Sequence, residues 1–191
     1  MTQPSAPLSE AEFFALVHAN PANALVLKRL PRLGLRECTL TAGCLFQTVW
    51  NARSDRPPAW GIRDFDVFYF DDGDLSWEAE NRVIEAGQKL FADTSLDVQI
   101  RNQARVHLWF EQKFGAPRAP LASARQGIDG FLIECTCIGI DTGSGDLYAP
   151  HGLEEMWNGV LRINRTLPRP DLFAQKARDY QQRWPWLTIA E

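Results

Sequence analysis

The sequence has no apolar run that approaches the ~20 residues a membrane-spanning helix needs. Its first seven residues, MTQPSAP, are polar and contain no basic segment leading into an apolar one, so no signal peptide is expected. Only four cysteines occur, and none has CxxC spacing. We therefore expect reduced, buried thiols in a cytoplasmic protein that does not contact membranes.

Internal repeats and low-complexity tracts are also absent, which excludes a solenoid or a disordered chain. The 191 residues are 45% hydrophobic and 11% aromatic, a composition typical of one globular domain. We expect a helical segment over residues 1–34 and a main domain over residues 35–191, joined as a single globular unit. The net charge of −4 argues against nonspecific nucleic-acid binding.

Acidic side chains are concentrated between residues 64 and 97, a segment with ten acidic and only two basic residues. Basic residues become frequent just beyond it. An acidic patch beside a basic surround could hold a metal together with phosphate. The simpler interpretation is a solvated helix face, and we assign Glu78, Glu80 and Glu85 to such a face.

Local signals predict the order of the elements. Ser9 with Glu12 forms a capping box, and Asn20-Pro21 begins a second helix that should end near residue 30. Further helices are expected over residues 43–53, 77–92, 104–114 and 171–183, with a short one after Gly152. Strands are expected over residues 62–70, 96–101, 133–140 and 146–149, the last two as a hairpin. This order indicates an α+β (α/β) fold with a small mixed sheet flanked by helices.

The strand IRDFDVFYF, residues 62–70, carries the main chemical signal. Alternate side chains of a strand leave the same face, so Asp64 and Asp66 should project together while Phe65 and Val67 cover the other face. Two carboxylates this close repel each other unless a cation lies between them. Magnesium suits that position, because it favours carboxylate oxygens and retains waters for substrate phosphates.

Two further features could converge on this pair. Gly43-Cys44 begins a helix, whose free N–H groups can hold phosphate oxygens. Asp97 begins the next strand and would bring a third carboxylate if the two strands pair. Such a set is the apparatus of in-line phosphoryl or nucleotidyl transfer. The alternative is structural: one Asp bonds loop N–H groups and the other pairs with Arg63.

Four ordered segments, residues 41–51, 61–70, 101–109 and 148–153, resemble a little-characterised bacterial nucleotidyltransferase-like family with the nucleotidyltransferase fold of DNA polymerase beta. The resemblance covers residues 35–190. It implies Mg²⁺ or Mn²⁺ at Asp64, Asp66 and Asp97, and a nucleoside triphosphate as substrate. Cys44 stands where Ser or Gly is usual, and a proline-containing loop lengthens the interval between Gly43 and Asp64.

Other polar residues are candidates for nucleotide contacts. Arg101 and Arg105 could bind triphosphate oxygens bidentately, and Arg63 is a third candidate. Alternatively, Arg101 forms a structural ion pair with Asp97 or Asp66. Gln47 could contact a base or sugar, or simply face solvent.

The favoured function is metal-dependent transfer of a nucleoside monophosphate from a triphosphate to the hydroxyl of an unidentified acceptor, which is a small molecule or a protein. A non-catalytic nucleotide- or partner-binding module of the same fold is the first alternative. A metal-dependent phosphohydrolase or nuclease, which uses similar carboxylates, is the second.

Overall fold

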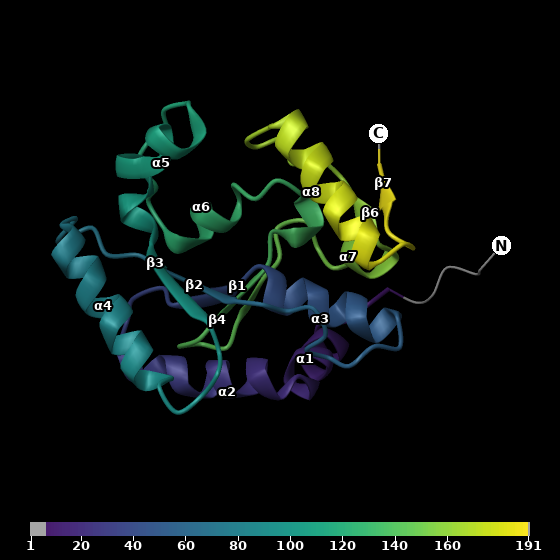
Figure 1. Ribbon diagram of the computed structural model, residues 1–191, viewed down its shortest axis with the longest axis horizontal. Helices are drawn as coiled ribbons and strands as arrows, with labels where there is room; N and C mark the ends of the chain where they lie inside the picture. Colours follow the sequence, from purple (N-terminus) through teal and green to yellow (C-terminus); the bar gives the residue numbers. More distant parts are fainter. Residues whose placement is uncertain (1–6, 191) are drawn as a thin grey trace.

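Five strands pair into one mixed sheet in the order β3-β2-β1-β4-β5 in the computed structural model, which describes residues 7–190 (Figure 1). The strands are β1 (Thr39–Thr41), β2 (Phe65–Tyr69), β3 (Val98–Asn102), β4 (Gly139–Asp141) and β5 (Leu147–Tyr148). β2 and β3 run parallel, and the other neighbours run antiparallel. The predicted mixed sheet flanked by helices is therefore confirmed.

Helices cover both faces of this sheet. α1 (Glu10–Ala19) and α2 (Pro21–Arg29) lie below it in Figure 1, with α4 (Trp77–Leu90) beside them. α5 (Val106–Phe114), α6 (Ala124–Ile128) and α8 (Pro170–Arg183) lie above it. The predicted caps are present: Ser9 and Glu12 form the capping box of α1, Asn20 caps α2, and Ser76 caps α4.

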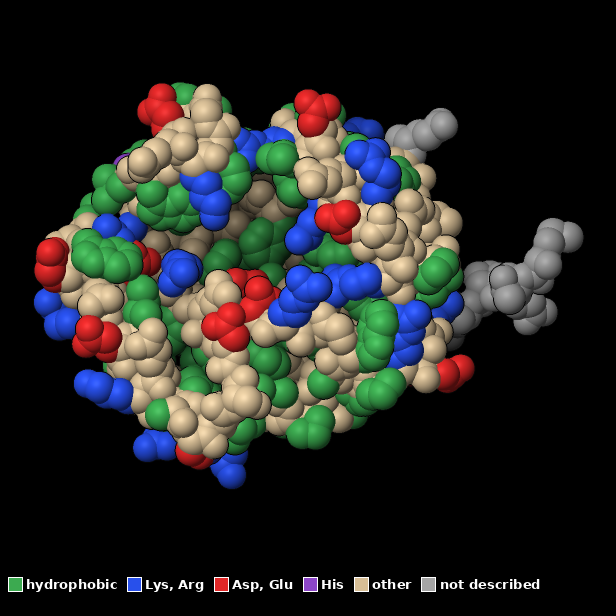
Figure 2. Space-filling model, in the orientation of Figure 1, with side chains coloured by type: hydrophobic (Ala, Val, Ile, Leu, Met, Phe, Trp, Pro, Cys, Tyr) green, Lys and Arg blue, Asp and Glu red, His purple; other side chains and the backbone are tan. Residues whose placement is uncertain are grey.

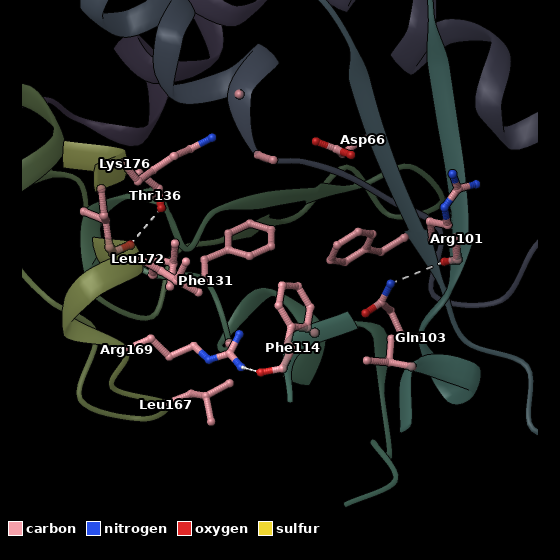
Figure 3. A pocket seen from close by; sticks show the side chains of 18 of the residues that line it. Asp66, Arg101, Gln103, Phe114, Phe131, Thr136, Leu167, Arg169, Leu172 and Lys176 are labelled. Atoms are coloured by element: carbon pink, nitrogen blue, oxygen red, sulfur yellow. Dashed lines mark hydrogen bonds between the residues drawn. The ribbon is translucent and has the colours of Figure 1, made fainter. Parts of the chain in front are cut away.

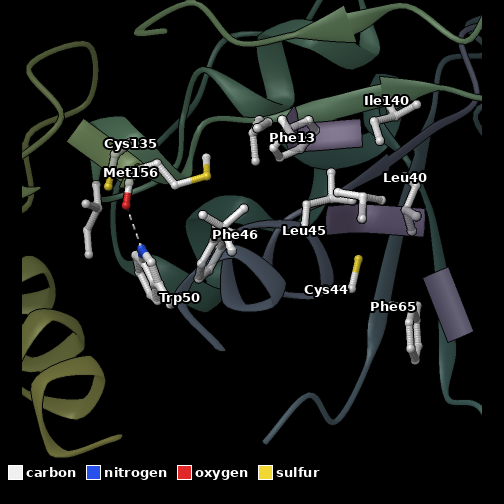
Figure 4. Close-up of a cluster of buried hydrophobic side chains, with 14 of the residues drawn as sticks. Phe13, Leu40, Cys44, Leu45, Phe46, Trp50, Phe65, Cys135, Ile140 and Met156 are labelled. Carbon is white, nitrogen blue, oxygen red and sulfur yellow. Dashed lines mark hydrogen bonds between the residues drawn. The ribbon is translucent and has the colours of Figure 1, made fainter. Parts of the chain in front are cut away.

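α3 (Gly43–Arg53) is the central helix, because an unbroken run of its residues from Cys44 to Asn51 is buried. Trp50 is fully buried, and its Nε1 donates to the backbone oxygen of Met156 at 3.1 Å (Figure 4). Met156 lies in the short helix α7 (Glu154–Asn158). α3 thereby connects the sheet to the C-terminal elements within one hydrophobic core.

Short elements complete the chain. They are the 3₁₀ turns η1 (Leu30–Leu33), η2 (Gln103–Arg105) and η3 (Glu134–Thr136), and a second, parallel sheet of β6 (Val160–Leu161) and β7 (Thr188–Ile189). None of the helices formed by residues 7–190 has the length and apolar character needed to cross a bilayer. All four cysteines are free and buried, as expected.

Two local expectations were wrong. The strand expected from residue 133 begins only at Gly139, because residues 134–136 form η3. Its turn is closed locally: the Thr136 hydroxyl donates to the Ile133 oxygen at 2.8 Å, a bond that competes with strand pairing. Glu80, which we assigned to a solvated face, is only 3% exposed and pairs with Arg105. A buried carboxylate needs such a partner.

Candidate functional site

The carboxylate pair lies where the strand alternation predicts. Burial alternates along β2: Phe65, Val67 and Tyr69 are buried, whereas Asp66 is only half-buried. Asp66 is paired in register with Thr41 of β1 and with Gln99 of β3. Asp64 and Asp66 both line one pocket. The strand expected from residue 62 begins at Phe65, so Asp64 directly precedes β2 and shares the pocket with Asp66.

The start of α3 lies beside this pair, because β1 ends at Thr41 and the helix begins at Gly43. Ala42 has a positive φ of 63°, and no side chain caps the N–H groups of the first turn. Ala42 and Gly43 both line the pocket. The Leu45 N–H donates to the Ala42 oxygen at 3.1 Å, which leaves the N–H groups of Gly43 and Cys44 and the positive end of the helix dipole for an anion.

The pocket has a volume of about 500 Å³ and is bounded by the sheet, α5, α6 and α8. Figure 2 shows a hollow on this face with acidic and basic side chains close together. Arg101 lines it from β3, and Arg169 and Lys176 line it from the start of α8 and from that helix (Figure 3). Lys113 of α5 and Arg118 of the loop after it add two further cations. Cations outnumber the two carboxylates, so the pocket suits an anionic ligand.

Asp66 has a strongly perturbed pKa. Burial first, and then the charge of Asp64, raises the pKa of Asp66 to about 6. Arg101 and Lys176 act in the opposite direction, without cancelling this shift. The ionised form of Asp66 is therefore destabilised in the protein alone, and a bound cation would favour it.

Gln47 is held in one orientation beside Gly43. Arg183, the last residue of α8, donates through Nη1 to Gln47 Oε1 at 3.2 Å and to the Gly61 oxygen at 3.0 Å. The Gln47 amide nitrogen packs so closely on Gly43 that a Cβ at residue 43 would lie 2.5 Å from it. Because its oxygen accepts from Arg183, the amide turns its NH₂ donor toward Gly43, and both residues line the pocket.

Among the predicted residues, Gly43, Gln47, Asp64, Asp66 and Arg101 come together in this pocket. Arg101 forms no ion pair with Asp97 or Asp66, and its Nη1 donates to the Ile100 oxygen at 3.0 Å.

The structure places the other predicted residues elsewhere. The Cys44 thiol is fully buried in the core and donates to the Thr41 oxygen, so it faces away from the pocket. Arg105 is bound to Glu80 and to the Leu75 oxygen. Arg63 is exposed. Asp97 is exposed as well, and it accepts from Gln99 Nε2 at 2.9 Å.

The backbone of Asp97 nevertheless lies next to the backbone of the carboxylate pair. Its carbonyl accepts from the Phe65 N–H at 2.8 Å, because β2 and β3 are parallel and in register. No group of three His, Cys, Asp or Glu side chains within residues 7–190 is arranged to hold a metal. In this conformation the site offers two carboxylates, not three.

Most pocket residues were not among the predicted site residues, and those nearest the chemistry include Gln99, Arg169, Lys176 and Tyr180. A signal existed for Gln99, which alternates with Asp97 and Arg101 on one strand face. Lys176 and Tyr180 are four residues apart and so share a face of α8. Nothing in the local pattern indicates that this face meets β2.

Comparison with known proteins gives three findings. Residues 28–189 match the family described as "Nucleotidyltransferase". An NMR structure described as revealing "a CCA-adding enzyme head domain" aligns over 100% of both chains with a TM-score of 0.78 and 22% identity. The Thermotoga maritima CCA-adding enzyme complexed with tRNA aligns over 100% of this chain and 44% of its own, with a TM-score of 0.59 and 13% identity. No curated protein matches the chain.

The two structural alignments establish the shared fold, and the family match spans most of the sequence. The resemblance seen in the sequence is thereby confirmed. The chain belongs to the nucleotidyltransferase family.

Proposed function

We propose that this chain is a metal-dependent nucleotidyltransferase that transfers a nucleoside monophosphate from a nucleoside triphosphate to an acceptor hydroxyl. The observation that carries the proposal is the shared pocket of Asp64 and Asp66, the uncapped start of α3 and several cationic side chains. Family membership supports the same reaction class.

The donor set fits a hard divalent cation. Asp66 projects from β2, and Asp64 directly precedes that strand. Burial first, and then the charge of Asp64, raises the pKa of Asp66, and a bound cation would favour its ionised form. Mg²⁺ commonly binds through one or two carboxylates and substrate phosphates. Asp64 and Asp66 would hold the ion, which when bound neutralises charge on the attacking and leaving oxygens. We retain Asp97 as a third carboxylate, which its side chain could supply by leaving Gln99.

The remaining residues bind and orient the triphosphate. The N–H groups at Gly43 and the Gln47 amide donate to phosphate oxygens beside the carboxylate pair. Arg101 and Lys176, whose charges already act on Asp66, stabilise the negative charge that develops during transfer. The aromatic and apolar pocket walls exclude water from the reacting groups.

The test is incubation with each α-labelled nucleoside triphosphate and Mg²⁺ or Mn²⁺, with a cell extract as the acceptor pool. We expect metal-dependent labelling of an acceptor that Asp66→Asn abolishes. Asp72→Asn is the matched control, because Asp72 is exposed and lies outside the pocket lining. Equal labelling by Asp66→Asn, or labelling in EDTA, would contradict the proposal.

A binding module without turnover is the second candidate, favoured by the absence of a three-acid cluster among residues 7–190. It predicts metal-dependent binding of a triphosphate with no transferred label. Stoichiometric transfer from the α-labelled triphosphate would exclude it.

A further inference from the structure

Arg118 and Arg169 form a pair of half-buried guanidinium groups in the pocket wall. They belong to segments far apart in the chain, the loop after α5 and the start of α8. Burial first, and then the charge of Arg169, lowers the pKa of Arg118, so the two cations are close enough to repel each other. Lys113 adds a third cation on the same helix as Phe110 and Phe114.

No carboxylate within residues 7–190 pairs with either guanidinium. Arg118 donates only to the Gln126 oxygen and Arg169 only to the Phe114 oxygen, each at 3.4 Å. Each guanidinium has five N–H donors, so most donors of both groups remain free. Half-buried cations without a counter-charge are unfavourable in the protein alone, and an anionic ligand would stabilise them.

Aromatic rings fix both groups in place. The Arg169 guanidinium lies 4.5 Å from the Phe114 ring centroid and 5.1 Å from that of Phe110, and Arg118 lies 5.0 Å from Phe110. Gly130 provides the remaining space, because a Cβ there would lie 2.5 Å from Arg118 Nη2. These contacts orient two planar forks before any ligand binds, and such forks match phosphate geometry.

The pair lies at a distance from the carboxylates. In Figure 3 Arg169 and Asp66 are on opposite sides of the cavity, with Phe131 and Phe114 between them. Phe131 and Phe68 both line the pocket and are in edge contact, with ring centroids 5.8 Å apart. The space between the two charged ends therefore offers apolar, aromatic surfaces to a planar ring.

We propose that Arg118 and Arg169 form a second anion-binding subsite, which binds the phosphate of the acceptor. The acceptor is then a nucleotide, free or at the end of an oligonucleotide, whose planar base lies on the aromatic wall. This inference rests on the proposed function for the direction of transfer, but the subsite itself is a binding property.

The experiment is calorimetric titration of the full chain with AMP in EDTA, and separately with MgATP. We expect AMP to bind without metal, and adenosine to bind at least tenfold more weakly than AMP. Arg118→Ala and Arg169→Ala should weaken AMP binding at least tenfold and change MgATP affinity less than threefold. Asp66→Asn should do the reverse. Arg165→Ala is the matched control, because Arg165 is exposed and lies outside the pocket lining.

A thermal melt of every variant shows whether it is folded. Arg169→Lys keeps the positive charge and should bind AMP more tightly than Arg169→Ala does. A 5′-phosphorylated triadenylate that competes with AMP assigns the subsite to a chain end, and failure to compete assigns it to a free nucleotide. Equal losses of AMP and MgATP binding in the arginine variants, or no metal-free AMP binding by the wild type, would overturn the inference. Because none of these titrations needs turnover, absence of transfer would contradict only the proposed function.

Discussion

Asp66 lies half-buried beside Asp64. This arrangement suits cation binding, but without a cation it lowers the stability of the folded protein. The pKa of Asp66 rises from its usual 3.8 to about 6 on folding. The folded state therefore binds the proton more tightly than the unfolded state, and stability falls as the pH rises from about 4 to about 6. Above pH 6 the full destabilisation remains.

Asp66→Asn should consequently stabilise the metal-free protein at pH 7. We expect a gain of about 1–2 kcal/mol in the free energy of unfolding, below the ~3 kcal/mol equivalent to a two-unit shift, because solvent screens a half-buried carboxylate. The gain should largely disappear near pH 3, which lies below the pKa of Asp66 in both states. Denaturant melts in EDTA at pH 3 and pH 7 measure it, with Asp72→Asn as control. Equal effects at the two pH values would show that folding does not raise the pKa of this carboxylate.

The position of Asp66 could be predicted from strand alternation, whereas the contacts of the Cys44 and Arg105 side chains could not. Alternation has a period of two and fixes which side chains share a face. Cys44 and Arg105 depend on which neighbour each side chain meets, the Thr41 oxygen in one case and Glu80 in the other. Thr41 is three residues from Cys44, whereas Glu80 is 25 residues from Arg105. Local sequence does not encode a contact over the longer separation.

At the scale of elements, Glu80 and Arg105 join α4 to the end of β3. Glu80 accepts from the Asn102 N–H at 2.8 Å and from Arg105, whose Nε donates to the Leu75 oxygen at 2.9 Å. Both side chains are almost fully buried. A buried charge that loses its partner is strongly destabilising, whereas an apolar replacement of both is tolerated.

We therefore expect Arg105→Leu alone to lower the free energy of unfolding by about 3–5 kcal/mol. Combining it with Glu80→Leu should recover part of that loss, because no unpaired charge then remains buried. Urea denaturation of the two single variants and the double variant completes the cycle. Strictly additive losses would show that the pair is not coupled.

α8 and α3 meet through Arg183 and Gln47, which makes the C-terminal helix part of the proposed triphosphate site. Arg183→Ala should release the Gln47 amide and raise the KM for the triphosphate about fivefold to tenfold, with a smaller change in kcat, because a donor used in both ground and transition states is lost. Arg183→Lys should restore part of the affinity. The steady-state rates against triphosphate concentration measure this, and Arg178→Ala is the control from the same helix.

Elements were easier to predict than their pairing. The caps at Ser9, Asn20 and Ser76 are local, and the helices began where they indicated. The strand expected from residue 133 begins only at Gly139, because local hydrogen bonds of η3 replace strand pairing before it. Apolar content alone does not distinguish a strand from such a turn. The contact between α8 and the pocket depends on long-range packing around Trp50, Tyr180 and Trp184.

At the scale of the whole molecule, the N-terminal helices share one core with the elements that build the pocket. Phe13 and Val17 of α1 are fully buried in the same cluster as Trp50 and Trp184. Asn20 and Asn23 extend this contact, since both donate to Thr48 of α3. We propose that residues 7–34 and the rest of the described chain unfold as one cooperative unit.

Phe13→Ala tests this proposal, because the first 34 residues contain no tryptophan and fluorescence reports only on the remainder of the chain. The substitution creates a core cavity and should cost about 3–5 kcal/mol. If the unit is single, the fluorescence and far-ultraviolet circular dichroism transitions should move together to a lower denaturant midpoint. Phe14→Ala, at a half-buried neighbour, should move both by less. A fluorescence midpoint unchanged by Phe13→Ala would mean that the N-terminal helices unfold separately and do not stabilise the elements that build the pocket.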